Sequence, residues 1–317
     1  MNSSPKYSGK DVAMVIPTKD RPEKVREFLA SVAAQNVRPG LIVFVDSGES
    51  IEPIISLFTD QLNIKYYVAN QKGQIPQRNQ GIATLTSDTP LVAFFDDDIV
   101  LEAGAIRAMI SYLNELPENT AGVGFNIINM EGLKSNFLLE ILGITCTKPG
   151  HVLRSGANTP ITSIDKNIES HWLCGGATVW KLEIVNQFNH REFSTRWASC
   201  EDLIFSYPIG KKYPLFVCAD AKVRHEHVYD HTGNQKFYFY GKTETLWRLY
   251  FVMSNPELSI FSFLKMILAL SVARFILGVA KFRTKHFQFA LGQIKGLYLG
   301  FLVIFKFKSW TDVLGEA

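Results

Sequence analysis

Paired cysteines, net charge and repeats are all scarce in this chain of 317 residues. Its four cysteines (Cys146, Cys174, Cys200 and Cys218) form no CxxC pair and no metal-ligand spacing, so a zinc site is not expected. Because an N-terminal signal peptide is also missing, we expect reduced thiols in a cytosolic protein. The formal net charge of +3 is too small to argue for a nucleic-acid partner. The sequence contains no internal repeat and no low-complexity segment.

Strand-like and helix-like segments alternate through the first half, which predicts an α/β fold with a mostly parallel sheet flanked by helices. Strands are expected at residues 11–18, 41–45, 64–69, 91–95 and 123–128, and helices at 20–36, 77–86 and 103–116. A loop-rich insertion covers residues 129–166. Beyond it we expect a strand at 171–180 with Gly175 and Gly176 inside it, a helix at 201–211 and a strand at 215–223.

The most informative segment is residues 94–99 (FFDDDI), where an apolar strand runs into three consecutive carboxylates. Carboxylates are costly to leave unpaired at the end of a buried strand. One Asp would suffice to cap a following helix, so three in a row indicate another task. Oxygen ligands are what a hard divalent cation takes. Because open α/β sheets bind ligands beyond the carboxyl ends of their strands, we expect a metal site here.

Polar groups also follow the other predicted parallel strands, at Thr18, Asp20 and Asp46. The carboxyl ends of parallel strands lie at one edge, so these side chains should converge with the three aspartates. Asp46 could accept the imide N–H of a nucleobase. Asp96 could accept a ribose hydroxyl.

A metal held by Asp98 could bridge a diphosphate. The segment 73–81 (GQIPQRNQG) supplies Arg78, either an ordinary surface residue or a guanidinium beside the diphosphate.

Four segments in order resemble the signatures of glycosyltransferase family 2: residues 15–22 (VIPTKDRP), 43–48 (VFVDSG), 78–81 (RNQG) and 94–99 (FFDDDI). The resemblance covers about residues 11–250. It implies the GT-A fold, a Rossmann-like mixed sheet flanked by helices, with a nucleotide-sugar donor, Mn²⁺ or Mg²⁺, and inversion at the anomeric centre. The three aspartates stand at the family's DXD motif.

The resemblance also implies roles for individual residues. The donor nucleotide would contact residues near the first four strand ends, namely Pro17, Thr18, Asp20, Arg21, Asp46, Arg78, Asp96 and Asp97. The metal would be held by Asp98, Asp96 and His225, and the acceptor would lie near Trp172, Gly175 and Gly176. Residues 199–202 (SCED) resemble the family's ED motif, which makes Asp202 the general base and Glu201 a supporting residue.

An inverting transfer is a single displacement, so one base must remove the acceptor's proton. The alternative for Asp202 is a first-turn carboxylate favoured by the helix dipole. His225 could equally be a satisfied polar group, with His227 and His231 weaker metal candidates. Trp172 and Trp197 could stack on a sugar ring or belong to the core.

The last seventy residues differ in composition from the rest of the chain, because Phe, Lys and Arg all accumulate there. We expect neither apolar segment, 260–281 or 287–307, to span a membrane, because charged residues interrupt both. Ser271, Arg274, Gly278 and Lys281 share one helix face, opposite an apolar face. That pattern favours a helix in the membrane interface with Lys and Arg at anionic headgroups. The alternative is a hairpin packed on the catalytic domain or across a dimer interface.

Residues 1–250 are expected to form the catalytic domain, with a nucleotide-sugar half at about 1–128 and an acceptor half at about 129–250. Residues 251–317 would form a C-terminal helical region. We expect a metal-dependent inverting hexosyl- or deoxyhexosyltransferase with a glycan or lipid-linked acceptor, serving cell-surface polysaccharide or glycolipid synthesis. It would be peripheral on the cytoplasmic face of the cell membrane, where it could form a homo-oligomer.

Two other functions compete with this one. A sugar-phosphate nucleotidyltransferase needs a glycine-rich loop after the first strand, and residues 17–22 contain no glycine. A non-catalytic sugar-binding relative would have no need of Asp96, Asp98 and the Glu201–Asp202 pair.

Overall fold

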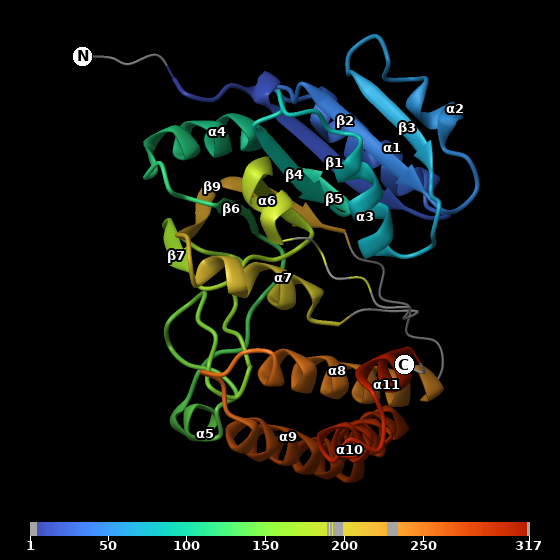
Figure 1. Ribbon diagram of the computed structural model, residues 1–317, viewed down its shortest axis with the longest axis vertical. Coiled ribbons are helices and arrows are strands. Elements are labelled where there is room, and N and C mark those ends of the chain that lie inside the picture. Colours follow the sequence, from blue (N-terminus) through green and yellow to red (C-terminus); the bar gives the residue numbers. More distant parts are fainter. Residues whose placement is uncertain (1–4, 189, 191, 193–198, 227–233, 316–317) are drawn as a thin grey trace. The chain divides into compact units, whose positions relative to one another are not determined.

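The computed structural model of this protein describes residues 5–188, 190, 192, 199–226 and 234–315 (Figure 1). The chain divides into two compact units, and each is described by itself. The first unit comprises Met1–Gly132, Ile161–Arg191 and Phe205–His227. The second comprises Leu133–Pro160, Glu192–Ile204 and Val228–Ala317.

The first unit is built on a mixed sheet with the strand order β3-β2-β1-β4-β8-β6-β9-β5, in which β7 also pairs with β9. The strands are β1 (Val12–Thr18), β2 (Leu41–Asp46), β3 (Ile64–Val68), β4 (Leu91–Phe95), β5 (Ile99–Leu101), β6 (Gly122–Ile127), β7 (Ile168–Ser170), β8 (Ala177–Lys181) and β9 (Leu215–His225). The helical elements are η1 (Gly9–Asp11), α1 (Pro22–Ala33), α2 (Glu52–Ile55), α3 (Gln74–Ala83), α4 (Ala105–Glu115), α6 (Leu182–Phe188) and α7 (Glu201–Gly210), the last beginning in the second unit.

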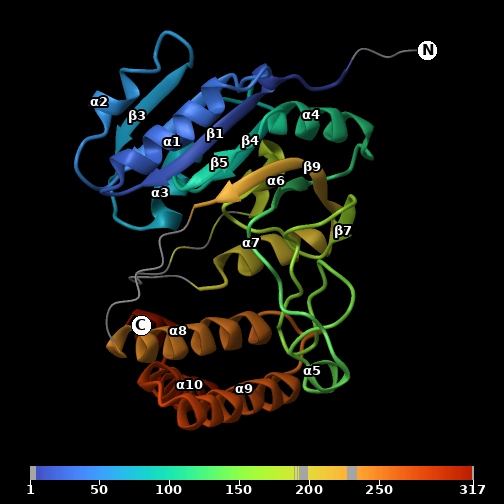
Figure 2. The ribbon, with the colours of Figure 1, turned by 180° about the vertical axis from the view of Figure 1, so that it is seen from behind.

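Six strands run in one direction, because β1 is parallel to β2 and β4, β2 to β3, and β6 to β9. Strand β8 lies antiparallel between β4 and β6, which keeps those two strands parallel to each other. Strands β4 and β9 therefore end at the same edge of the sheet. The antiparallel pair of β5 and β9, visible in Figure 2, aligns Ile99 with His225 at that edge.

The sheet is apolar on both faces because helices cover both, as α/β folds require. Every residue of β1 and β4 is buried. Phe28 of helix α1 contacts the Phe44 ring edge-on and the Phe95 ring at a tilt. Phe95 in turn contacts the Phe125 ring. This apolar packing holds the strand ends in fixed positions, which is what a precise polar site beyond them needs.

Most of the predicted strands and helices are confirmed, including β1, β4 and α7. The predicted strand at 171–180 is confirmed only from Ala177 onward, because the chain leaves the sheet after β7 and returns there as β8. Gly175 and Gly176 therefore form a turn that precedes β8. Helix α8 was not predicted, because its polar and apolar residues show little helical segregation.

The second unit is helical. It contains α5 (Phe137–Ile141), α8 (Asn234–Met253), α9 (Ile260–Lys281), α10 (Thr284–Ile304) and α11 (Trp310–Gly315). The Ser259 side chain accepts the Ser262 N–H at 3.3 Å and caps the start of α9. Helix α9 ends at Phe282, which adopts a left-handed conformation with φ of 47°. Gly292, Gly296 and Gly300 bring α10 against α8, where a Cβ atom at Gly292 would lie 2.0 Å from the Tyr238 carbonyl oxygen.

Helices α9 and α10 are long and apolar enough to cross a membrane by length and composition. Mean hydropathy reaches 2.0 in α9 and 1.4 in α10, although 22% and 44% of those stretches are buried within the protein. A core helix of a soluble protein passes the same test, so length and composition alone do not decide how these helices are used.

Candidate active site

The predicted convergence at the carboxyl edge of the sheet is present in the first unit. Asp96, Asp97 and Asp98 follow β4, and Thr18 ends the neighbouring strand β1. His225 ends β9 and lies opposite Ile99 in the β5–β9 pair, so Asp98 comes directly beside it. The bond from the Glu226 N–H to the Asp98 carbonyl oxygen, 2.8 Å long, continues this pairing. The register of β5 on β9 therefore fixes the position of Asp98 beside His225.

Asp97 is held inside the protein. Its carboxylate accepts the Thr18 hydroxyl at 2.7 Å and pairs with the Arg21 guanidinium at 3.0 Å, and only 5% of the residue is exposed. Burial raises the pKa of Asp97 to about 6, although Thr18 and Arg21 act in the opposite direction. Both Asp97 oxygens thus serve the protein itself, tying the end of β1 to the turn after β4.

Asp96 is the most accessible of the three carboxylates, with a side chain that is 25% exposed. Its Oδ1 accepts the Gln74 amide at 2.6 Å and the Arg78 guanidinium at 3.3 Å, both from α3. Gly176 lies close against it, since a Cβ atom there would be 2.6 Å from Asp96 Oδ2. Any side chain at position 176 would push this carboxylate aside.

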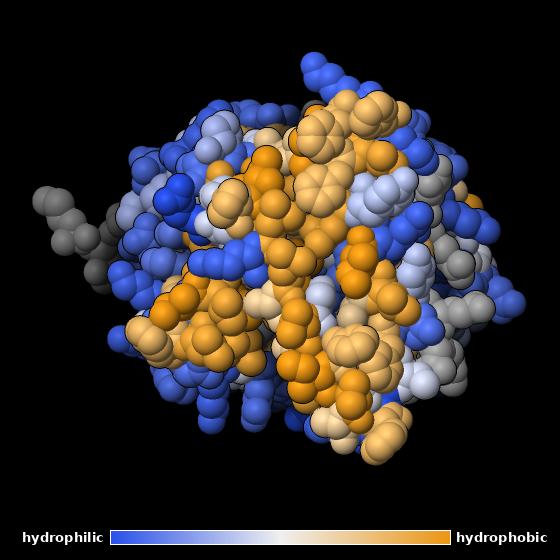
Figure 3. All heavy atoms as spheres, turned by 90° about the horizontal axis from the view of Figure 1, so that it is seen from below, coloured by the Kyte–Doolittle hydropathy of each residue, from blue (hydrophilic) through white to orange (hydrophobic). Residues whose placement is uncertain are grey.

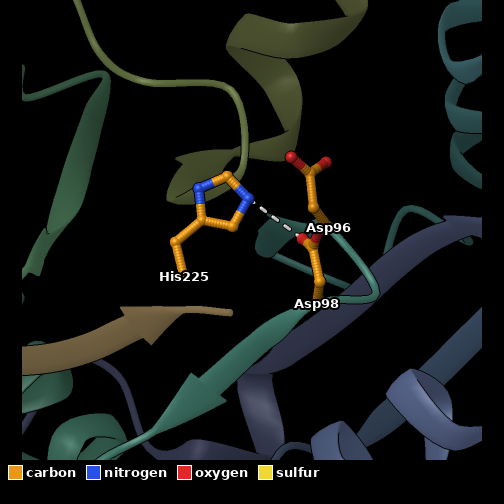
Figure 4. A group of neighbouring side chains, drawn as sticks. All are labelled: Asp96, Asp98 and His225. Carbon is orange, nitrogen blue, oxygen red and sulfur yellow. Dashed lines mark ion pairs between the residues drawn. The ribbon is translucent and has the colours of Figure 1, made fainter. Parts of the chain in front are cut away.

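Asp96, Asp98 and His225 bring one donor atom each within 4.8 Å of one another (Figure 4). His225 Nε2 lies 3.0 Å from Asp98 Oδ1, and Arg21 pairs with the other Asp98 oxygen at 3.2 Å. Burial would lower the pKa of His225, but the hydrogen bond and charge of Asp98 outweigh it and raise that pKa. Two carboxylate oxygens and one imidazole nitrogen fit a divalent cation such as Mn²⁺. These three residues could therefore hold a metal.

Arg78 is fully buried in α3 rather than open to a ligand. Its Nη2 bonds Asp96, its guanidinium carbon lies 5.2 Å from the centre of the Phe94 ring, and its Nε and Nη1 have no hydrogen-bond partner among the described residues. A buried arginine with one ionic contact is costly, so its position must serve that contact. The geometry fits an effect on Asp96 better than direct contact with a diphosphate.

His190 packs behind Arg78. Its ring stacks on Phe205 with centres 3.6 Å apart, and its carbonyl oxygen accepts the Asn79 side-chain amide at 3.0 Å. Burial and the Arg78 charge lower the pKa of His190 well below its ordinary value. The imidazole is therefore neutral near pH 7 and does not repel the Arg78 guanidinium.

Other predicted donor residues differ in how much they are exposed. Asp46 is 1% exposed, and its two oxygens accept the Gly48 N–H at 2.8 Å and the Tyr66 hydroxyl at 3.1 Å. The carboxylate therefore orders the turn after β2 and has no open side for a nucleobase. Pro17 is buried within β1. Asp20 is exposed and has a left-handed φ of 53°, and its carboxylate accepts the Glu49 N–H at 3.0 Å.

The residues predicted to lie on the acceptor side are found in different environments. Trp172 is 6% exposed, so its ring belongs to the interior. Gly175 lies in the turn before β8, next to Gly176. Glu201 and Asp202 form the first turn of α7 in the second unit, where Asp202 Oδ1 accepts the Leu203 N–H at 2.8 Å. Trp197, His227 and His231 lie outside the described residues.

Two glutamines were missed by the sequence reasoning. Buried Gln77 donates to the carbonyl oxygens of Thr18 at 2.8 Å and Val45 at 2.6 Å, and so joins the ends of β1 and β2. Gln74 bonds Asp96 directly. A signal for Gln77 was available, because it lies four residues before Gly81 and helical residues at that spacing share a face.

A groove of about 1010 Å³ lies elsewhere on the first unit, beside Tyr7, Pro90 and Lys181. Pro90 precedes β4, so this groove is at the amino ends of the parallel strands. None of the predicted site residues lines it.

Comparison with known proteins defines the class of this chain as a glycosyltransferase. The family described as Glycosyl transferase family 2 matches residues 13–177, more than half of the 317 residues. The chain belongs to this family. No curated protein sequence matches it.

Solved structures share the fold. The mannosyltransferase PcManGT from Pyrobaculum calidifontis, solved with GDP-Man and Mn²⁺, has a TM-score of 0.58 at 12% identity, over 93% of this chain and 89% of that one. GalNAc-T7, solved with UDP, GalNAc and Mn²⁺, has a TM-score of 0.51 at 12% identity, over 77% of this chain and 51% of that one. At such identities the likeness establishes the GT-A fold alone.

We predict that His190 makes this protein less stable in mild acid. Because the pKa of His190 is lower in the folded state, only the unfolded chain takes up its proton as pH falls below about 6.5. That proton removes up to about 1.4 kcal/mol of unfolding free energy per pH unit. His190→Gln should reduce the loss between pH 7 and pH 5 in urea titrations. Equal pH slopes in the two proteins would contradict the neutral, buried imidazole.

Proposed function

We propose that this protein is a metal-dependent inverting glycosyltransferase that moves a hexosyl or deoxyhexosyl group from a nucleotide sugar to a glycan or lipid-linked acceptor. Its membership of Glycosyl transferase family 2 supports the class. The observation that carries the proposal is the meeting of Asp96, Asp98 and His225 at the carboxyl edge of the sheet. PcManGT and GalNAc-T7 were both solved with Mn²⁺ and nucleotide or nucleotide-sugar ligands, which supports Mn²⁺ or Mg²⁺ here.

In this proposal, Asp96, Asp98 and His225 hold the cation, and Arg21 keeps Asp98 in place through its 3.2 Å ion pair. When bound, the cation neutralises charge that develops on the leaving diphosphate. Asp97 fixes Thr18 and Arg21 around the donor. Asp202, supported by Glu201, accepts the proton of the acceptor hydroxyl as it attacks the anomeric carbon.

Arg78 contributes as a positioning residue. Its contact with Asp96 holds that carboxylate toward Asp98, while the glycine at position 176 leaves the space that the carboxylate needs. The buried guanidinium thus acts through Asp96.

The proposal also places the protein on a membrane. The apolar helices α9 and α10 support attachment to a membrane. We place the protein at its cytoplasmic face, where a lipid-linked acceptor in polysaccharide or glycolipid synthesis would be within reach. Homo-oligomers are compatible with this arrangement.

We predict that Asp98→Asn abolishes turnover and metal-dependent binding of a nucleoside diphosphate. The substitution removes a carboxylate charge from the cation site while keeping the side chain's size. Asp220→Asn, at an exposed position of β9, is the matched control and should retain both properties. Isothermal titration with Mn²⁺ and UDP or GDP, with and without EDTA, measures the effect. Full turnover after EDTA treatment would exclude the metal.

Asp202→Asn should lower kcat by about 10²–10⁴-fold and leave the affinity for the donor nearly unchanged, since general base catalysis is worth that much. Donor affinity is measured by titration and turnover by release of the nucleoside diphosphate. A parallel loss of donor affinity would instead place Asp202 in the donor site.

Arg78→Met should weaken Mn²⁺ binding about 10–100-fold, the usual effect of losing a residue that orients a metal ligand. Arg78→Lys keeps a charge near Asp96 and should recover part of this affinity. If Arg78 contacts the donor itself, the donor KM would rise at saturating Mn²⁺ while Mn²⁺ affinity stayed unchanged. Thermal unfolding of both variants separates these outcomes from loss of the fold.

A further inference from the structure

The first half of helix α9 buries Phe263, Met266 and Ile267, whereas its second half has polar residues on its inner side and apolar residues on its outer side. Ser271 is buried and donates to Gln293 of α10 at 3.0 Å, and the Arg274 guanidinium lies 3.5 Å above the Phe289 ring. Of the polar face that was expected to meet lipid headgroups, Ser271, Arg274 and Gly278 contact α10, whereas Lys281 is exposed. The Arg274 guanidinium thus makes a cation–π contact within the hairpin.

The exposed side of the hairpin is an apolar stripe on each helix. On α9 the stripe comprises Phe261, Leu268, Val272, Phe275, Ile276 and Val279, each at least 53% exposed. On α10 it comprises Leu291, Ile294, Tyr298 and Phe301, each at least 41% exposed. Apart from the adjacent Phe275 and Ile276, successive members are three, four or seven residues apart, which keeps each set on one side of its helix.

Helix α5 extends this surface. The Lys265 ammonium of α9 donates to the Ile141 carbonyl oxygen at 2.5 Å, and α5 exposes Phe137, Leu138 and Ile141. Figure 3 shows the hydrophobic side chains gathered across this side of the helices. We call this surface of α5, α9 and α10 the apolar face. Soluble monomers rarely expose an apolar patch of this extent, so the face needs an occupant.

Charge indicates which occupant fits. Between Leu258 and Thr311 the chain has no Asp or Glu, but besides Arg274 it has seven Lys or Arg residues: Lys265, Lys281, Arg283, Lys285, Lys295, Lys306 and Lys308. A second copy of the chain would bring another basic surface against the first, with like-charge repulsion. An anionic lipid surface supplies both the apolar layer and the opposite charge.

The packing of α10 on α8 indicates how the hairpin meets the lipid. Gly292 and Gly296 face α8, on the side of α10 opposite its apolar stripe. Helix α8 carries Lys236, Lys242, Glu244 and Arg248. If α10 crossed the bilayer, α8 would enter the hydrocarbon with it, and each charge there is costly. The length of α10 permits it to span a bilayer, but the charged residues of the neighbouring helix α8 oppose such a span.

We propose that the apolar face lies flat in one leaflet of an anionic bilayer, with α9, α10 and α5 against the acyl chains and α8 on the water side. This deepens the membrane attachment proposed above and does not depend on glycosyl transfer. The stripe residues carry the contact, and the Ser271–Gln293 and Arg274–Phe289 contacts hold the hairpin together inside the protein.

Flotation of the full chain with vesicles tests the contact. We expect binding to phosphatidylcholine vesicles that contain phosphatidylglycerol, and at least tenfold weaker partition for the double variant Val272→Asp/Ile276→Asp. The matched control is Leu57→Asp/Val68→Asp, which places the same charges at exposed apolar positions of the first unit and should bind normally. Circular dichroism in a non-ionic detergent verifies that both variants are folded. If the intact protein does not float with anionic vesicles, or if both variants bind as it does, the proposal fails.

The depth of the helices in the bilayer is tested by labelling with a photoactivatable diazirine carried on a lipid acyl chain, followed by peptide mapping. Peptides of α9 and α10 should be labelled and those of α8 should not. Equal labelling of α8 would overturn the flat placement in favour of a span. A dimer in sedimentation analysis without lipid, lost in the Val272→Asp/Ile276→Asp variant, would assign the apolar face to a second copy instead. These readouts do not require glycosyl transfer, so failure of the proposed function would leave them unchanged.

Discussion

Three carboxylates in succession at the end of a buried strand must be compensated, and the edge of the first unit is arranged around that need. Asp97 and Asp98 are 5% and 3% exposed, so water can stabilise neither. The compensating groups come from three separate segments: Arg21 after β1, Arg78 from α3 and His225 at the end of β9. Parallel strand direction brings all of them to the same edge. The carboxylates are thus held in place before any ligand arrives, which is what preorganised charge stabilisation requires.

Much of this edge could be predicted from the sequence because it depends on local patterns. Alternation of strands and helices places strand ends together, and an acidic run after an apolar strand is visible without a structure. The triple aspartate, Thr18 and a strand at 215–223 were found in this way, whereas His225, which ends the observed β9, was implied by the family resemblance. Gly175 and Gly176 were assigned to a strand, because an apolar run hides the departure of the chain from the sheet. Their turn exists so that Gly176 can lie against Asp96, a contact between distant residues that no local pattern encodes.

Solvent access was the harder property to predict. Asp46 and Arg78 have the side-chain chemistry that a nucleobase and a diphosphate require, yet both are buried and bonded to neighbouring residues. Exposure depends on how α3 and the turn after β2 pack, which follows from Gln77 bridging the ends of β1 and β2. Residue type therefore reveals what a group can bind, while packing decides whether it binds a ligand or supports a residue that does.

Solvent access is also hard to predict from the sequence in the second unit. Helical periodicity correctly separates a polar and an apolar side of α9, but it does not reveal which side faces the protein. Water would select the apolar side for the interior, whereas here Ser271 and Arg274 are turned inward and Phe275 and Ile276 outward. Hydrogen bonding and the cation–π contact make the interior tolerable for these polar groups. An exposed apolar side is costly in water, although Phe263, Met266 and Ile267 of the same helix are buried as water requires. The exposed stripe on the second half of α9 therefore supports the proposed contact with lipid.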